Sequence, residues 1–383
     1  MNYGIIYNLI YAQAALDGRE AALFGDCASR ADDVFERSFV GSSFPEVWFE
    51  LPLLGEPWFD LHVLTSRESL MDGAASAAGR APQCAGTSGA AEPAPQCAGT
   101  SGAAEPAPRR TGTAEAAESA PRRTGTAEAV EPAPQIFYPE VFEWFATQAT
   151  DGRQLALSHD ISKGLVDNPA VQLLLYHRND DTMGGFFQAA GRPDAVGAYR
   201  AFMERKPQDW FACYAGVFPS RADMGLRVEC IPTEEMQQAY AQDAALLEAH
   251  LNQLGISTAG TTIIPWCQSF ARLPFRIEFQ FNIAPDGTAE PTLGLSARFL
   301  LPGDNKPEAI FKTSGAAGQL MEQLEAWGLA DDRWRLLPAT AFSRCVSFQG
   351  ESMRLYCFPT FVKIRWRNGE AHDAKAYLIA STW

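Results

Sequence analysis

Residues 275–283 alternate strictly between apolar and polar side chains, and few folds accommodate such a segment. Five large apolar residues share one parity and four charged or amide residues share the other: Phe275, Ile277, Phe279, Phe281 and Ile283 against Arg276, Glu278, Gln280 and Asn282. Successive side chains of a strand point to opposite faces, so the segment predicts a strand with one apolar and one polar face. Any fold for this chain must bury the apolar face of this strand and place its polar face where the charged and amide groups have partners or solvent.

Similar strands recur in pairs along the chain, and a helical pattern precedes each pair. The paired strands are expected at 45–54 and 57–66, 155–162 and 170–178, 210–218 and 224–231, and 275–283 and 291–301, followed by strands at 345–350, 353–358, 361–366 and 374–379. The helical patterns lie at 20–39, 138–149, 181–208, 233–254 and 313–329. The helix at 233–254 is expected to run unbroken from Thr233 as N-cap to Gly255.

Helices that alternate with pairs of strands indicate antiparallel hairpins, each covered by a helix. The predicted fold class is α+β, an antiparallel β-barrel of about ten strands built from five helix-strand-strand repeats, with helices outside and a polar lumen. A barrel of that strand number can hold a ligand. The alternative is an open antiparallel sheet whose polar face is simply solvated.

In the barrel, the apolar parity faces the helices and the polar parity faces the lumen. The same reading on the other strands gives seven inward cations: Arg227, Arg276, Arg298, Arg354, Lys363, Arg365 and Lys375. Carboxylates, amides and tyrosines share that face: Glu50, Glu278, Gln280, Asn282, Tyr176, Tyr214, Tyr356 and Tyr377. Buried cations are costly without a counter-charge, so a polyanion or solvent is expected beside them.

The overall charge limits the partners. The net charge of −15 and a pI near 4.8 argue against nucleic acid or an anionic membrane surface as the main partner. The eight cysteines include no CxxC pair, which indicates reduced thiols and a cytoplasmic location. The N-terminus lacks the basic region of a signal peptide, and no apolar run approaches the length of a membrane helix.

Residues 72–135 differ from the rest. A 13-residue unit, APQCAGTSGAAEP, occurs twice and is followed by two related units, with prolines at 82, 95, 108, 121 and 134. The units carry no large apolar residue, so this segment is expected to be a disordered insertion. Residues 1–71 are then the first repeat of the barrel and residues 136–383 the remainder of the same domain.

Five helix-strand-strand units around a polar lumen resemble the ABBA-type aromatic prenyltransferases, the PT-barrel family. That family includes the dimethylallyltryptophan synthases and the cyanobactin-type peptide prenyltransferases. The segments MRLYCF and AKAYL look like its cation-x-Tyr strands. The resemblance covers the chain from about residue 20 to its end, apart from the insertion.

The resemblance implies an enzyme that moves an allylic prenyl group from its diphosphate to a small aromatic or peptide acceptor. The seven cations would hold the diphosphate, and Tyr176, Tyr214, Tyr356 and Tyr377 would shield the allyl cation. Glu50 would orient the acceptor and remove a proton. No cofactor is required by this reading, although Asp60 or Asp160 could help to hold Mg²⁺.

Two other functions fit the same pattern: a barrel that binds a small anionic or hydrophobic ligand without catalysis, and an interaction scaffold. Other residues carry less chemistry. Asp60 and His62 could begin a metal site but lack a second nearby histidine. His159, His177, Cys213 and Cys230 have the apolar parity and are expected to be packed.

Overall fold

A computed structural model describes residues 19–25, 34, 46–66, 137–148, 154–161, 164–175, 181–219, 225–299, 315–348 and 351–382. Tyr176, His177 and the repeats at 72–135 lie outside them, so the expected insertion and the domain boundaries around it stay predictions. The described residues all belong to one compact unit.

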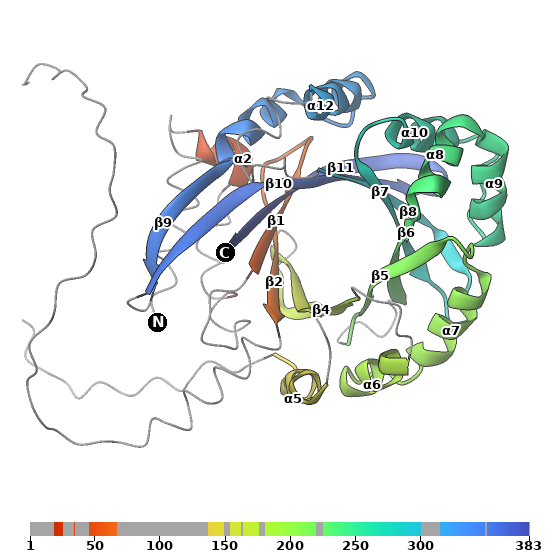
Figure 1. The fold of residues 1–383 in the computed structure, drawn as a ribbon, viewed down its shortest axis with the longest axis horizontal. Helices are drawn as coiled ribbons and strands as arrows, with labels where there is room; N and C mark the ends of the chain where they lie inside the picture. The colour runs from red at the N-terminus through yellow and green to blue at the C-terminus, as the bar shows by residue number, and fades with distance from the viewer. Residues whose placement is uncertain are drawn as a thin grey trace, which may run out of the picture. The chain divides into compact units, whose positions relative to one another are not determined.

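A closed ring of antiparallel strands forms the centre of this unit (Figure 1). Ten strands make the ring: β1 (Glu46–Pro52), β2 (Asp60–Ser66), β3 (Gln154–Asp160), β4 (Leu165–Leu174), β5 (Trp210–Val217), β6 (Leu226–Pro232), β7 (Arg276–Ile283), β8 (Ala289–Arg298), β10 (Glu351–Arg367) and β11 (Glu370–Thr382). The ring closes because β11 pairs with both β1 and β10. The expected α+β antiparallel barrel is therefore confirmed, whereas its construction from five repeats stays a prediction.

The long strand β10 belongs to two pairings in succession. Its first part pairs with β9 (Phe342–Phe348), and its second part pairs with β8. An irregularity between Pro359 and Phe361 separates the two parts. The sequence segments 353–358 and 361–366, expected as two strands, are thus one strand with a β-bulge.

Helical segments lie on the outside of the ring (Figure 1). They are α2 (Glu20–Phe24), α5 (Pro139–Thr147), α6 (Asp181–Ala189), α7 (Ala195–Arg205), α8 (Glu234–Gln242), α9 (Ala244–Gln253), α10 (Ile263–Ala271), α12 (Ala316–Ala326) and the 3₁₀ segment η3 (Asp332–Thr340). Among the described residues, no helix is long and apolar enough to cross a membrane.

The alternating strand β7 shows why helices and strands fit together. Ile277, Phe279 and Phe281 are fully buried on its outer face. Phe279 stacks on Trp210 at 4.7 Å between ring centroids, and Phe281 contacts Phe202 of α7 at 5.6 Å. Burial of such side chains stabilises the fold by roughly 1.5–3 kcal/mol each, so the apolar parity must face the helices.

The single helix expected from Thr233 to Gly255 is wrong. Thr233 does cap a helix, since its hydroxyl accepts a hydrogen bond from the Met236 amide. At Asp243, however, the backbone becomes extended and α8 ends. The Asp243 side chain accepts a hydrogen bond from the Leu246 amide and so begins α9. The apolar spacing continues across the break, which hides it in the sequence.

The turn between β7 and β8 requires glycine at position 287. Gly287 has a φ of 80°, and a Cβ there would lie 2.4 Å from the Ala201 Cβ on α7. We expect Gly287→Ala to lower the free energy of unfolding by roughly 2–4 kcal/mol, from left-handed backbone strain and the clash together. Denaturant unfolding measures the loss.

Gly191→Ala is the matched control. Gly191 has a φ of 70°, but its Cβ would meet no atom within 4 Å. Its replacement should cost only the backbone strain, about 1–2 kcal/mol. Equal losses for the two variants would contradict the close packing of the turn on α7.

Candidate functional site: two cavities in the barrel lumen

The barrel encloses two adjoining cavities. The amphipathic cavity, of about 350 Å³, is lined by charged residues together with Trp48, Phe211, Tyr214, Phe361 and Tyr377. The polar cavity, of about 190 Å³, is lined by residues that include Asp60, Ser158, Asp160 and Lys375. Six residues line both cavities: Glu50, His62, Gln172, Arg227, Gln280 and Arg365. The polar strand faces therefore look inward, as the sequence predicts.

Glu50 lies on β1 at the wall shared by the two cavities. Its carboxylate accepts hydrogen bonds from Lys375 and from the Tyr377 hydroxyl at 2.6 Å, and it lies 3.2 Å from His62 Nε2. Burial alone would raise the pKa of this carboxyl, but Lys375 and His62 outweigh burial and hold the pKa well below its ordinary value. Glu50 is thus an ionised hydrogen-bond acceptor.

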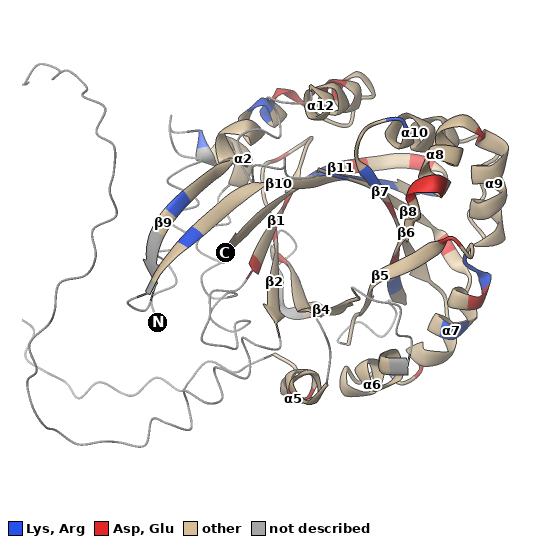
Figure 2. Cartoon of the chain, in the orientation of Figure 1, with Lys and Arg blue, Asp and Glu red and all other residues tan. Residues whose placement is uncertain are grey.

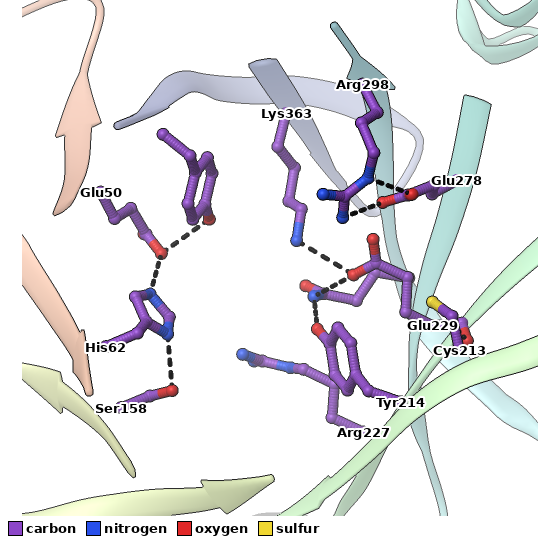
Figure 3. Close-up of polar contacts among 12 residues, drawn as sticks. Glu50, His62, Ser158, Cys213, Tyr214, Arg227, Glu229, Glu278, Arg298 and Lys363 are labelled. Atoms are coloured by element: carbon purple, nitrogen blue, oxygen red, sulfur yellow. Dashed lines mark hydrogen bonds and ion pairs between the residues drawn. The ribbon is translucent and has the colours of Figure 1, made fainter. Parts of the chain in front are cut away.

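His62 continues the network from β2 to β3. Its Nδ1 lies 2.6 Å from the Ser158 hydroxyl, and Ser158 lines the polar cavity. Figure 3 shows Glu50, His62 and Ser158 as one connected row on one side of the lumen. Sequence reasoning missed His62 and Ser158 as a pair, although His62 shares the inward parity of β2.

A second network lies across the lumen, around two buried glutamates (Figure 3). The Arg298 guanidinium binds both oxygens of Glu278, at 2.6 and 3.1 Å. Glu229 accepts from Lys363 at 3.2 Å and from Gln280 at 3.0 Å. Gln280 also contacts the Tyr214 hydroxyl.

The two glutamates have opposite protonation tendencies. Burial opposes ionisation of Glu278, but Arg298 prevails and lowers its pKa to about 2. For Glu229, burial raises the pKa, and the nearby Glu278 adds to the effect against the attraction of Lys363. Sequence reasoning did not select Glu229, although its parity with Arg227 on β6 was the available signal.

The cations in the lumen have carboxylate partners that the sequence did not reveal. Arg276 also binds Glu278, and Arg365 binds Asp373. Arg227 differs, because within the described part of the chain its side chain contacts the Asn282 amide and the Phe218 ring. The counter-charge expected from a polyanion or solvent is thus supplied in large part by the protein itself.

Six of the seven predicted cations line the cavities, and Arg354 does not. Arg354 is exposed and lies on the part of β10 that pairs with β9. Tyr356 lies on the same part and packs against the hydrophobic core. The bulge in β10 separates both residues from Phe361, Lys363 and Arg365, which line the amphipathic cavity. Basic and acidic residues both lie on the barrel strands (Figure 2).

Among the tyrosines, Tyr214 and Tyr377 line the amphipathic cavity. Burial raises the pKa of each phenol well above its ordinary value, so both remain neutral at physiological pH. The Tyr377 ring stacks on Phe361 at 4.0 Å. Two further aromatic walls that the sequence analysis did not select are Trp48 and Phe361.

Cys213 lies in the lumen, contrary to the expectation from its parity. An irregularity in the β5–β6 pairing between Ala212 and Tyr214 brings both Cys213 and Tyr214 to the lumen side. Burial raises the pKa of the Cys213 thiol well above its ordinary value, which disfavours a nucleophilic thiolate. His159 is buried against Phe137, as expected of a packed residue, and also borders the polar cavity.

Asp60 and Asp160 both line the polar cavity. Within the described ranges, no group of three His, Cys, Asp or Glu side chains is arranged to hold a metal ion. Two carboxylates and a substrate oxygen would still be a suitable ligand set for Mg²⁺.

Comparison with known proteins finds similarity in the solved structures. A 6-dimethylallyl tryptophan synthase matches over 97% of this chain and 94% of its own, with 9% identity and a TM-score of 0.45. The prenyltransferase PriB, solved as a ternary complex with L-tryptophan and dimethylallyl thiolodiphosphate, matches over 99% and 95%, with 11% identity and a TM-score of 0.46. The similarity to these two proteins is one of fold. No family model and no curated protein matches the sequence.

Proposed function

We propose that this protein transfers an allylic prenyl group from its diphosphate to an aromatic acceptor inside the lumen. The observation that carries the proposal is the make-up of the amphipathic cavity. Five of its lining residues are arginine or lysine, three are glutamate, and aromatic rings form much of the remaining wall. An excess of cations beside aromatic faces suits a leaving diphosphate next to an allyl cation.

The diphosphate is assigned to the wall shared by the two cavities, where Arg227 and Arg365 lie. Arg227 is the first candidate, because an amide rather than a carboxylate binds it. Lys363 and Arg298 extend this wall, although a diphosphate must compete there with Glu229 and Glu278. Charge-assisted hydrogen bonds to phosphate oxygens would stabilise the departing group.

The allyl cation is assigned to the aromatic side of the same cavity. Tyr214, Tyr377, Trp48 and Phe361 present rings there and exclude water. Glu50 would orient the acceptor: three donors already bind its carboxylate, which has about four acceptor positions, so one remains for an N–H or O–H group. The acceptor is proposed as a small aromatic compound or an aromatic peptide side chain.

A resident metal is not required by this proposal, since side chains can neutralise the diphosphate. Asp60 and Asp160 would hold Mg²⁺ if the substrate brings it. Activity measured with Mg²⁺ and with EDTA separates the two cases.

The pairing of the lumen cations with carboxylates supports a second candidate, a barrel that binds a small anionic or hydrophobic ligand without turnover. Binding and chemistry therefore need separate measurements. The first is the thermal unfolding midpoint with dimethylallyl or geranyl diphosphate, which must rise if the ligand binds the folded state. The second is product formation with a panel of indoles, phenols and aromatic peptides, followed by mass spectrometry. Binding without product would favour the non-catalytic barrel, and no shift with any allylic diphosphate would contradict prenyl transfer but not a barrel for another ligand.

We expect Arg227→Gln to weaken binding of the allylic diphosphate by about 10- to 100-fold, because a charge-assisted contact contributes roughly 1.5–3 kcal/mol. Isothermal titration calorimetry measures the change. Arg354→Gln is the matched control, since Arg354 is exposed and does not border either cavity. Equal weakening by the two replacements would contradict a diphosphate site at the shared wall.

A further inference from the structure

The lumen holds a hydrogen-bonded row whose role the proposed function leaves open. Glu50, His62 and Ser158 follow one another on neighbouring strands, with contacts of 3.2 and 2.6 Å on either side of the imidazole. Glu50 and His62 line both cavities, whereas Ser158 lines the polar cavity. The row therefore leads from the wall of the amphipathic cavity into the polar cavity.

The contacts of Glu50 make it a weak proton acceptor. Lys375, Tyr377 and His62 all surround the carboxylate, and an acid that is so well stabilised as an anion has little tendency to take up a proton. The Glu50 carboxylate also determines where the hydrogen of His62 lies. A carboxylate can only accept hydrogen bonds, so His62 Nε2 must carry the hydrogen of the 3.2 Å contact.

That assignment fixes the other ring nitrogen. In a neutral imidazole with a protonated Nε2, Nδ1 has a free lone pair and accepts the hydrogen bond from the Ser158 hydroxyl. Nδ1 is then the basic atom of the row. A proton taken up there gives an imidazolium whose charge faces the Glu50 carboxylate.

From this geometry we infer that His62 is the proton acceptor of the reaction, that Ser158 links it to the polar cavity, and that Glu50 is the positioning residue that fixes its tautomer. The inference rests on the proposed prenyl transfer. In that reaction a bond forms between the allylic carbon and the acceptor while the carbon–oxygen bond to the diphosphate breaks and its electron pair leaves with the diphosphate. The acceptor then loses a proton, whose bonding electrons return to the acceptor: the Ser158 hydroxyl takes up this proton as its own proton passes to His62 Nδ1. Water at the polar cavity removes it afterwards.

Several charged groups line the cavities beside this row. They are Lys375 and Tyr377 on β11, Asp60 on β2, Asp160 on β3, Arg227 on β6 and Arg365 on β10. Lys375 is bound to Glu50 and lies 3.9 Å from Asp60. Two carboxylates thus compensate the charge of the Lys375 ammonium group, which weakens its effect on the His62 imidazole.

The first test needs no substrate. Nitrogen chemical shifts of ¹⁵N-histidine protein, with His62 assigned by comparison with His62→Gln, report which ring nitrogen carries the proton. The expected result is a protonated Nε2 and an unprotonated Nδ1 at neutral pH, and a shift of this balance in Glu50→Gln, whose amide can also donate. A protonated Nδ1 with a bare Nε2 in the wild-type protein would overturn the inference.

The second test uses turnover. His62→Gln should lower kcat by about 10²- to 10⁴-fold, the usual contribution of a general base, with affinity for the allylic diphosphate changed less than threefold. Ser158→Ala should lower kcat less and shift the acidic limb of its pH profile. His250→Gln is the matched control: His250 lies on α9 outside the barrel, where Nδ1 contacts the Tyr240 hydroxyl at 2.6 Å.

The outcomes separate the inference from the function beneath it. Product formation that survives in His62→Gln at the wild-type rate overturns the role of His62 but leaves prenyl transfer standing. A wild-type protein that binds allylic diphosphates and prenylates none of the acceptors overturns the proposed function and this proton acceptor together, while the tautomer measurement still decides how Glu50 orients the ring.

Discussion

Replacement of Arg298 by Gln is expected to lower the free energy of unfolding by about 3–5 kcal/mol, the usual cost of removing one partner of a buried ion pair, because only the solvent-screened Arg276 then stays bound to Glu278. The guanidinium binds both oxygens of Glu278, and the Glu278 side chain is 0% exposed. Denaturant unfolding at neutral pH measures the loss. The double variant Arg298→Gln/Glu278→Gln should recover part of it, because no charge then stays buried.

Arg276→Gln is the control for this pair. Arg276 binds the same carboxylate at 2.9 Å, but its side chain is 42% exposed. Its replacement should cost no more than about 1 kcal/mol, as for other solvent-screened ion pairs. Equal losses from the two arginine variants would contradict the assignment of Arg298 as the partner that holds Glu278 ionised.

The same pair predicts an acid dependence. The pKa of Glu278 is about 2 in the folded protein against an ordinary value of 4.5. A lowered folded pKa stabilises the protein above the unfolded value and loses that contribution as pH falls through the folded one. The stability difference between wild type and Arg298→Gln should therefore shrink between about pH 4.5 and pH 2, which unfolding curves across that range will measure.

Glu50→Gln is expected to reduce kcat for prenyl transfer by about 10²- to 10³-fold. The amide removes the ionised group that faces Lys375 and orients both the acceptor and His62. Steady-state kinetics with a saturating allylic diphosphate measures the change. The affinity for the diphosphate should not fall, because Glu50 is an anion and repels rather than binds it.

Glu46→Gln tests whether this effect belongs to position 50. Glu46 lies on the same strand with the same parity and accepts a hydrogen bond from Trp48 at 2.7 Å. Burial raises the pKa of the Glu46 carboxyl, and a protonated carboxyl resembles the glutamine amide more closely than the ionised Glu50 does. Comparable losses of kcat in the two variants would show that the loss is not specific to position 50, and the assigned role of Glu50 would fail.

Strand parity was predictable because it is local. The alternation on β7 indicates directly which residues pack under helices and which line the lumen. Ile277 and Phe279 are of the first kind, and Glu278 and Gln280 are of the second. The local breaks that escaped prediction include the cap at Asp243 and the bulge after Pro359. Neither interrupts the apolar spacing, so the sequence pattern passes through both.

The networks of the site depend on which strands become neighbours. Glu50 and Lys375 are 325 positions apart, and His62 and Ser158 are 96 apart. Each residue could be placed on the inward face from its own strand, but the pairing of charges could not. This is why the sequence predicted a set of inward cations and the structure shows cations that neighbouring carboxylates largely compensate.

The closure of the ring by β1 and β11 also sets the order in which the protein can assemble. Strand β1 can complete its pairing only after β11 has been made, and a contact between residues so far apart in the sequence forms late and slowly. During synthesis at the ribosome, β1 has an unpaired edge until β11 emerges. Because Lys375 and Tyr377 come from β11, the environment of Glu50 is completed only when β11 is in place. Formation of the Glu50 network would then report that β11 has been inserted, and a chain truncated before β11 would have a lumen without its ionised centre.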